Sequence, residues 1–388
     1  MSNLLPNDIV TNILSRLPVK SVLRFRCVCK FWYSLINNPY FIKMHLNQTI
    51  ENNNNTILLR THQSKLYSIE LDDNDQAIEI DYPTIEIKDY PDKAIYDTRS
   101  CFNVAGSCNG LLCIWNIDRD VFIWNPSTKE FKILPQTPNK LVQDYRDYSL
   151  EWDSYYGFGY DSNLDDYKVV KISQYYDNRA IEYFKSEVNV YTLRSNSWRR
   201  VDNMSIRIDS EDQVVPVYVN GNINWRGEDD MYGFPGVIVS FDLVHEIWRQ
   251  HPQPEFKEKV IQLGVLGKNL CLLTDNSNQS DVWVMKDFGV KESWCKLFTI
   301  PKLMGMDPFF LEVVCFSKSG ELLLNYRNRV LLLYNTKLEK TETLHIQGTP
   351  DSFMPITYEG SLVSLHSSTD VGNKKRKRQE FEVVYGLT

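Results

Sequence analysis

Residues 4–36 read LLPNDIVTNILSRLPVKSVLRFRCVCKFWYSLI. Leu5-Pro6-Asn7-Asp8 is a helix start signal, in which an Asx residue caps the first turn. The apolar residues that follow recur at helical spacing, and Pro18 ends the helix. This apolar stripe comprises Ile9, Val10, Ile13, Leu14 and Leu17. The pattern predicts a short amphipathic helix at the start of the chain.

Three further short helices follow in the sequence. Val22, Leu23 and Phe25 belong to the second helix, and Trp32, Leu35 and Ile36 belong to the third. Asn38-Pro39 predicts a cap with a first-turn proline, and the helix after it runs through Phe41, Met44 and Leu46. Four helices in about fifty residues bury too little apolar surface to be self-sufficient. Spacing alone leaves open whether the stripe docks on the rest of this chain or on a partner.

The order of these residues resembles an F-box at nearly every diagnostic position. Cys29 stands where the family usually has Ser, and Tyr33 where a polar or basic residue is common. The resemblance implies binding to a Skp-type adaptor, and through it to a cullin scaffold. By motif position, the residues expected to contact the adaptor or to support that contact are Leu5, Pro6, Ile9, Leu14, Leu17, Pro18, Val19, Leu23 and Trp32.

Composition and charge divide the chain into two parts. Its 388 residues could hold one large domain or two to three ordinary ones. Nine Trp and twenty-two Tyr, with many Asn, Asp and Gly, favour β structure with tight turns. Residues 1–49 hold six basic side chains against Asp8 alone, a net charge of +5, which leaves −12 for the rest. This asymmetry indicates two surfaces with different partners, although both can simply be solvated faces.

Several functional classes find no support in the sequence. The eight Cys show neither the spacing of a secreted disulfide framework nor that of a zinc site. Cys27 and Cys29 lie too close together on one helix to be a standard pair of metal ligands, and Cys101, Cys108 and Cys113 contain no C-x₂-C pair. No secretory signal and no apolar run of membrane-spanning length is present. We therefore expect a cytoplasmic protein, also nuclear if a basic signal acts, with no cofactor, no metal, no nucleic acid and no membrane partner.

A repeat begins after an Asn-rich segment that we interpret as a linker. Residues 71–100 read as a long loop, and from residue 101 two elements alternate. One is an Asn-Gly hairpin such as Asn109-Gly110; the other is a strand, a polar turn and an aromatic strand start, as in residues 121–131. The period of about forty to fifty residues is that of a β-propeller blade. Five blades fit between residues 101 and 347, and the strands at 57–70 and 356–366 would pair to close a sixth.

The predicted architecture is therefore α+β multidomain: a helical unit at 1–47, a linker at 48–56, an all-β, kelch-like propeller at 57–370 and a basic tail at 371–388. Five or seven blades, or an irregular antiparallel sandwich, are the alternatives. The body also resembles the plant F-box-associated, kelch-like domain, including the subfamily of S-locus F-box proteins and receptors with other roles such as defence. The matching motifs lie at residues 108–111, 124–128, 157–161, 166–170 and 283–294. Each has a structural explanation: Asn125-Pro126 starts a turn, Gly157 and Gly159 permit close packing, and Trp294 packs between blades.

The resemblance implies a non-catalytic substrate-recognition subunit of a Skp–cullin–F-box ubiquitin ligase. The propeller would hold a target protein, S-RNase-like if the chain is an S-locus member. Acidic residues at 70–81 and 228–230 favour a basic target. The alternatives are a non-ligase propeller scaffold and a propeller hydrolase. No catalytic set is evident: Asp165-Asp166 and Asp229-Asp230 are adjacent carboxylates that would not face one another, and His245 lies in a blade turn.

The tail holds the cluster Lys374-Lys375-Arg376-Lys377-Arg378. Such a cluster is typical of a nuclear import signal or a polyanion-binding patch, and the alternative is a solvated basic tail. A further strand is expected at residues 380–385.

Overall fold

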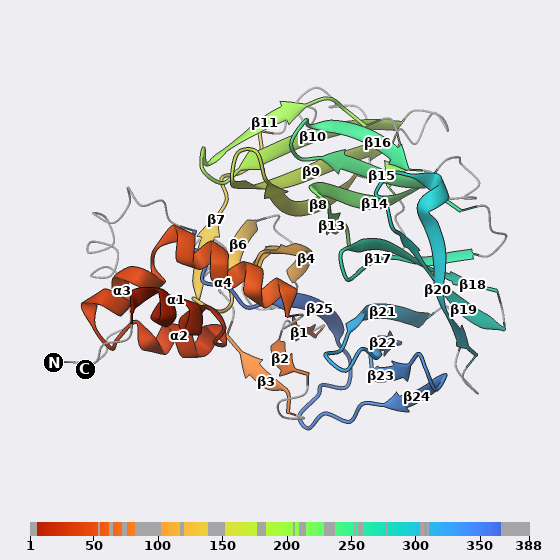
Figure 1. Ribbon diagram of the computed structural model, residues 1–388. Coiled ribbons are helices and arrows are strands. Elements are labelled where there is room, and N and C mark those ends of the chain that lie inside the picture. The colour runs from red at the N-terminus through yellow and green to blue at the C-terminus, as the bar shows by residue number, and fades with distance from the viewer. Residues whose placement is uncertain are drawn as a thin grey trace, which may run out of the picture.

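The computed structural model describes residues 6–52, 55–61, 65–71, 76–81, 102–116, 120–138, 152–176, 184–204, 206–208, 215–228, 237–251, 253–254, 259–276, 278–302, 307 and 310–365. Four helices at the N-terminus are followed by six antiparallel sheets arranged in a ring (Figure 1). The helices are α1 (Asn7–Ser15), α2 (Val19–Phe25), α3 (Lys30–Ile36) and α4 (Pro39–Glu51), together called the helical module.

The helix starts follow local capping chemistry in two of four cases. Asn38 caps α4, where its side chain accepts the Tyr40 amide at 2.8 Å and Pro39 occupies the first turn, as predicted. The Cys29 thiol caps α3 in the same way, accepting the Trp32 amide at 3.5 Å. The Asx cap predicted for α1 is wrong, because Pro6 is the N-cap residue and, among the residues described, no side chain caps the first turn.

The first three blades follow the chain in order, and the last strand of each lies at one edge of its sheet. Blade 1 is β4 (Phe102–Cys108), β5 (Leu111–Asn116), β6 (Val121–Asn125) and β7 (Glu130–Ile133). Blade 2 is β8 (Trp152–Asp161), β9 (Asp166–Tyr176), β10 (Phe184–Thr192) and β11 (Ser197–Val201). Blade 3 is β12 (Arg207–Ile208), β13 (Val217–Val219), β14 (Asn222–Glu228), β15 (Val237–Asp242) and β16 (Ile247–His251).

The next two blades repeat the arrangement. Blade 4 is β17 (Lys259–Leu266), β18 (Asn269–Asp275), β19 (Gln279–Met285) and β20 (Trp294–Pro301), with the short 3₁₀ turn η2 (Lys291–Ser293) before its last strand. Blade 5 is β21 (Leu311–Phe316), β22 (Leu322–Tyr326), β23 (Val330–Asn335) and β24 (Lys340–Thr343).

Strands from both ends of the propeller close the ring. Blade 6 is β25 (Met354–Glu359), β1 (Asn55–Arg60), β2 (Leu66–Glu70) and β3 (Ile78–Ile80). β25 pairs antiparallel with β1, from Asn55 opposite Glu359 to Arg60 opposite Met354. Closure removes the free edges that an open sheet would expose. The six-bladed prediction and the predicted pairing across the chain ends are both confirmed.

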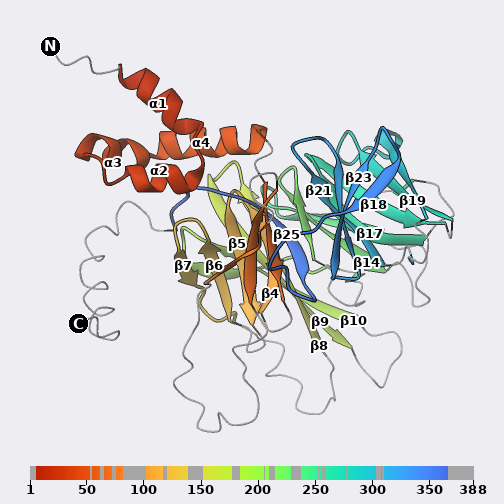
Figure 2. The same cartoon turned by 90° about the horizontal axis from the view of Figure 1, so that it is seen from below.

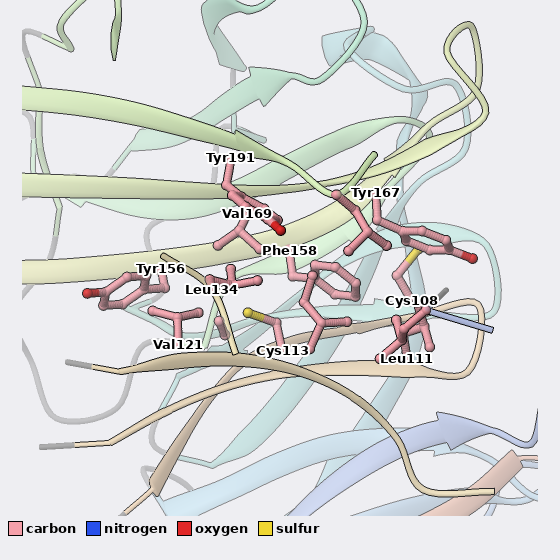
Figure 3. Packing of buried hydrophobic residues seen from close by; sticks show 14 residues of the cluster. Cys108, Leu111, Cys113, Val121, Leu134, Tyr156, Phe158, Tyr167, Val169 and Tyr191 are labelled. Atoms are coloured by element: carbon pink, nitrogen blue, oxygen red, sulfur yellow. The ribbon is translucent and has the colours of Figure 1, made fainter. Parts of the chain in front are cut away.

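A hydrophobic cluster lies at each of the six junctions between neighbouring blades. At the junction of blades 1 and 2, for example, Cys113 and Val121 meet Phe158 and Val169 (Figure 3). The middle strands of the blades are therefore buried on both faces, which explains runs such as VFIWN in β6, where every residue is buried. Trp294 lies in the cluster shared by blades 3 and 4, as its sequence context predicted.

The recurring polar turn is an Asx turn with one left-handed residue. A strand-ending Asn or Asp accepts the amides two and three residues ahead, and the residue four ahead has a positive φ. The pairs are Asn125 and Lys129, Asp161 and Asp165, Asp242 and Glu246, and Asn335 and Glu339. Local side-chain chemistry thus produces the repeat seen in the sequence.

Three boundaries differ from the prediction. The linker predicted at 48–56 is wrong at both ends, because α4 continues to Glu51 and β1 begins at Asn55. The Thr49 hydroxyl donates to the His45 carbonyl at 3.0 Å inside the helix, so an Asn-rich sequence still completes the last turn. The segment 71–100 also contributes β3, and Cys27 lies after α2 rather than on a helix with Cys29.

Candidate functional site

The helical module has a small apolar core that includes one residue from the far end of the propeller. Leu14, Val22, Ile36 and Phe41 come from the four helices, and each is at most 1% exposed. The fifth buried member is Leu362, which follows β25 and is 0% exposed. In Figure 2 the segment after β25 passes under the helices. The module is therefore completed by the propeller, which fits its shortage of apolar residues.

The apolar stripe of α1 divides into residues that are buried in the module and residues that are exposed. Val10 and Leu14 of α1, and Leu17 just after its end, belong to the module's core. Ile9 and Ile13 lie one turn apart on the other side and are 46% and 47% exposed. α1 is on the side of the module that faces away from the propeller (Figure 2). A helix that needed only intramolecular burial would leave polar residues at these two positions.

The turn between α2 and α3, and α3 itself, expose further apolar side chains. Val28 and Tyr33 are each 59% exposed, and Phe31 is 43% exposed. We call Ile9, Ile13, Val28, Phe31 and Tyr33 the outer apolar set. Large apolar side chains gathered on so small a unit are typical of a protein–protein interaction surface.

His45 ties α4 to the end of α1. The residue is 1% exposed, and its Nε2–H donates to the Leu17 carbonyl at 2.9 Å. Burial lowers the pKa of His45, and the bond to the Leu17 carbonyl opposes that shift only partly. The neutral ring is therefore favoured in the folded module, because protonation would place a charge and a second N–H, at the buried Nδ1, where no described group accepts it.

We expect the helical module to lose stability as the pH falls below about 6.5, the ordinary pKa of histidine in the unfolded chain. The unfolded state binds the proton more tightly than the folded state, so His45 contributes stability above that pH and loses it on acidification, by up to about 1.4 kcal/mol per pH unit. Hydrogen exchange of the α1 and α4 amides at pH 5.0 and 7.5 measures this locally. His45→Gln, which keeps a donor but does not titrate, should flatten the difference. A local readout is required because burial also lowers the pKa of His251 in the propeller. An equal loss in wild type and variant would contradict the assignment.

Two ion pairs join the helical module to the rim of the propeller. Lys20 contacts Glu70 at 2.5 Å, and Lys43 contacts Asp165 at 2.8 Å. Val19 packs beside Gly360, where a Cβ would come within 2.9 Å of it. The basic module thus meets an acidic rim, although exposed pairs of this kind add at most about 1 kcal/mol each. Leu362 is the stronger anchor because it is buried.

A latch from blade 1 holds the segment that carries Leu362. Asn125 is fully buried, and its Nδ2 donates to the carbonyls of Val363 at 2.8 Å and Ser361 at 3.2 Å. The Tyr358 hydroxyl bonds Ser127 in the same turn at 2.6 Å. Gly110, at φ 75°, leaves room for this segment, since a Cβ there would overlap Ser361.

The residues predicted to act in adaptor binding fall into three groups. Pro6, Ile9 and Pro18 are exposed and available for contact. Leu17, Val19, Leu23 and Trp32 are half-buried; Trp32 packs edge-on against Phe25 with ring centroids 5.3 Å apart. Leu14 is 1% exposed and can only support the surface from within. Leu5 lies outside the described residues.

Sequence reasoning left Ile13, Val28, Phe31 and Tyr33 out of the predicted contact set. One signal was available for Ile13: an apolar stripe with five members on so short a helix is wider than one buried face requires. Nothing in the sequence separated Val28 and Phe31 from core residues.

Comparison with known proteins identifies both parts of the chain. The F-box domain model matches residues 3–44, and the F-box associated beta propeller domain model matches residues 55–367. The chain belongs to the F-box proteins with an F-box-associated propeller. It is 31% identical to F-box protein CPR1 of Arabidopsis thaliana, over 97% of this chain and 92% of that protein. It is 29% identical to the F-box/kelch-repeat protein At3g23880 of the same plant, over 85% of this chain and 87% of that protein.

Solved structures add only a distant likeness. An oligogalacturonate lyase from Vibrio parahaemolyticus matches with a TM-score of 0.43 and 10% identity, over 76% of this chain and 80% of that one. A score this low carries no argument about the present chain.

The family motifs of this F-box protein act in folding. Lys168, in the second strand of blade 2, is almost fully buried. Its Nζ forms ion pairs with Asp161 Oδ2 and Glu246 Oε1, each at 2.7 Å. The same Nζ donates a hydrogen bond to the Leu243 carbonyl at 2.6 Å. Asp161 closes the GFGYD motif, while Leu243 and Glu246 belong to the next blade. Burial opposes ionisation of Asp161, but hydrogen bonds from Lys168 and two amides outweigh it and lower the pKa of that carboxyl.

Gly157 and Gly159, in the same motif, leave space for the neighbouring blade. A Cβ at Gly157 would meet Trp225 at 2.6 Å, and one at Gly159 would meet Leu243 at 2.7 Å. The prediction that these glycines permit close packing is confirmed.

Four buried cysteines and an adjacent pair of carboxylates have structural surroundings. Burial raises the pKa of Cys271 and of Cys315 to about 12, and it also raises the pKa of Cys108 and Cys113 well above the ordinary thiol value, so these thiols stay protonated. Asp165 pairs with Lys43, whereas Asp166 accepts the Arg194 amide at 3.0 Å, so these adjacent carboxylates serve different partners as predicted. In the described part of the chain, no three His, Cys, Asp or Glu side chains are grouped as metal ligands.

Several predicted features have limited structural support. His245 is exposed in its turn as predicted, though its ring bonds Asp242 at 2.9 Å. The carboxylates Glu70 and Glu79, from which a basic target was inferred, already pair with Lys20 and Lys65. Asp229, Asp230, the cluster at 374–378 and the strand expected at 380–385 lie outside the described residues. Among the helices that the structure describes, none is long and apolar enough to span a bilayer.

Proposed function

We propose that this chain is the substrate-recognition subunit of a Skp–cullin–F-box ubiquitin ligase. The F-box would bind a Skp-type adaptor through the outer apolar set, and the propeller would bind the target protein. The observation that carries the proposal is the division of α1 into a buried side and an exposed apolar side. Packing within the chain buries only one side of α1, so the exposed Ile9 and Ile13 indicate a surface that binds a partner protein.

The charge of the F-box supports the same partner. Arg16, Arg24 and Lys30 are exposed on the helical module. Adaptors of this family are acidic, so these side chains would accelerate association and orient the encounter.

The attachment of the F-box supports the receptor role. Leu362, the Asn125 latch and the two rim ion pairs fix the helical module on one face of the propeller. A receptor of this kind contributes no catalytic group. It raises the local concentration of target lysines near a charged ubiquitin-conjugating enzyme, and a fixed mount makes that concentration higher than a flexible tether would.

Substituting the exposed side of α1 tests the proposal. We expect Ile9→Asp with Ile13→Asp to weaken binding to a panel of Skp-type adaptors about a hundredfold, because both side chains would be central contacts that lose apolar burial. Titration calorimetry on the full-length chain measures the affinity. Both positions are exposed, so the double variant should unfold at the wild-type temperature.

A matched control places the same charge on the propeller. Leu338 is 66% exposed in the last turn of blade 5, and Leu338→Asp should bind the adaptors like wild type. The ligase proposal fails if wild type binds no adaptor, or if the α1 double variant binds as well as the Leu338→Asp chain. The non-ligase propeller scaffold would then be the favoured function.

The finer parts of the proposal rest on sequence. A cytoplasmic location, with nuclear import through Lys374 to Arg378, is proposed from composition and the basic cluster. A role in self-incompatibility with an S-RNase-like target is proposed from the S-locus resemblance alone.

A further inference from the structure

The tip of blade 5 holds an arginine in a strained backbone conformation. The turn between β22 and β23 is Arg327-Asn328-Arg329, since Tyr326 pairs with Val330, and its first two residues have a positive φ, 53° and 55°. Left-handed turn positions are normally filled by Asn or Gly, as in the two-residue turn Asn109-Gly110 of this chain. An L-residue with a long side chain pays about 1–2 kcal/mol for the left-handed conformation. Lys129, Glu246 and Glu339 adopt the same conformation within Asx turns, whereas other contacts impose it at the blade 5 tip.

Buried residues hold the tip in that conformation. The Asn325 side chain, 0% exposed, donates to Asn328 Oδ1 and to Glu312 Oε2, each at 2.7 Å. The Phe353 amide donates to the Asn328 carbonyl at 2.7 Å. The tip is therefore preorganised, which lowers the entropic cost of binding a ligand there.

The arginine side chains at the tip are displayed beside an exposed aromatic ring. The Arg327 guanidinium lies 4.6 Å from the centroid of Phe310, which is 42% exposed, and 5.5 Å from that of Tyr326. Arg329 is also exposed. Across the residues described, neither Arg327 nor Arg329 forms an ion pair. Stacking on aromatic rings leaves the N–H edge of a guanidinium open to an acceptor.

The tip lies on the propeller face opposite to the F-box. Lys43 contacts the turn between the first two strands of blade 2, and Leu362 follows the inner strand of blade 6 on that same side. The turn at Arg327 joins the second and third strands of its blade, and such turns lie at the other ends of the strands. A ligand at the tip therefore leaves the adaptor surface free.

We propose that Arg327, Arg329 and Phe310, the blade 5 tip, bind an anionic segment of the target protein. Two displayed guanidinium groups match carboxylate or phosphate oxygens, and Phe310 offers an apolar contact beside them. The chain outside residues 1–49 carries −12, so the attraction for anionic groups comes from the two guanidinium groups at the tip and acts against the overall charge. The inference names the target chemistry for the proposed receptor function and rests on it.

The test uses labelled peptides on the full-length chain and measures fluorescence anisotropy. The probes are an oligo-glutamate peptide, an oligo-glutamine peptide of equal length and a serine peptide with and without phosphate. We expect the anionic peptides to bind and the neutral ones not to, with affinity falling as salt rises. Arg327→Asn with Arg329→Gln should weaken anionic binding about tenfold. Lys337→Gln removes one exposed positive charge on the opposite face and should change nothing.

Stability provides a second, opposite readout. Asn accepts the left-handed conformation more readily than Arg, so Arg327→Asn should raise the unfolding midpoint by about 1–2 °C while it weakens peptide binding. Arginines that served the fold alone would give no loss of binding. The inference is overturned if wild type binds no anionic peptide, or if the double variant binds as well as wild type. Binding of only the phosphopeptide would assign the anion as phosphate. Adaptor affinity, measured on the same variants, reports separately on the proposed function.

Discussion

Leu362→Ala should unfold the F-box while the propeller remains folded. Leu362 is 0% exposed and packs among Leu14, Val22, Ile36 and Phe41, so truncation leaves a cavity in a core with few other members. Such truncations cost about 2–5 kcal/mol. A helical unit of this size has little stability of its own to lose. Adaptor affinity should fall in parallel, because binding would then have to order the helices.

Hydrogen exchange with mass spectrometry distinguishes local from global loss. We expect faster exchange in α1 to α4 and unchanged exchange in β5, β9 and β18, which are central strands. Leu338→Ala, at an exposed leucine of blade 5, is the control for a lost side chain outside any core. Uniform acceleration across both domains, or none in the helices, would show that Leu362 is not the anchor of the F-box.

Lys168→Met should destabilise the propeller by about 3–5 kcal/mol, the range found when one partner of a buried ion pair is removed. The substitution leaves Asp161, at 1% exposed, without its cation, and frees the Leu243 carbonyl from its donor. Glu246 keeps Arg199 as a partner. The loss falls on the junction of blades 2 and 3 because Lys168 joins them. Urea denaturation followed by tryptophan fluorescence measures it.

Two comparison variants separate the effect of burial from the loss of a lysine charge. Lys20→Met removes the exposed pair with Glu70 and should cost less than about 1 kcal/mol, although its 2.5 Å contact is shorter than those of Lys168. Adding Asp161→Asn to Lys168→Met removes the orphaned charge and keeps an acceptor for the Asn163 and Leu164 amides. Part of the stability should then return. Equal costs for Lys20→Met and Lys168→Met would contradict the role of burial.

Local patterns predicted the secondary elements because their causes lie within a few residues. The Asn38-Pro39 cap, the left-handed Asn109-Gly110 turn and the Asx turns all form between near neighbours in the chain. Local patterns predicted the helix ends wrongly where more than one residue could begin or end the helix. Pro6 rather than an Asx residue precedes α1, and α4 runs on into the Asn-rich segment.

The candidate site was predicted less completely than the fold. The F-box motif identified the helices, yet Leu14 lies inside their core while Val28, Phe31 and Tyr33 face outward. Helical periodicity distinguishes apolar from polar positions, but it does not say which apolar positions the chain itself covers.

The sequence by itself determined that helices precede a ring of blades, because hydrophobic period, caps and turn residues act over short distances. The tertiary structure alone decided how the two parts are joined. Asn125 bonds Val363 across a separation of 238 residues, Leu362 enters the core of the F-box, and Lys168 finds its partners on the next blade. These contacts depend on ring closure, which brings distant residues together and takes their polar groups out of water. The repeat predicted that the ring closes, but no periodicity in the sequence indicates which residues these contacts join.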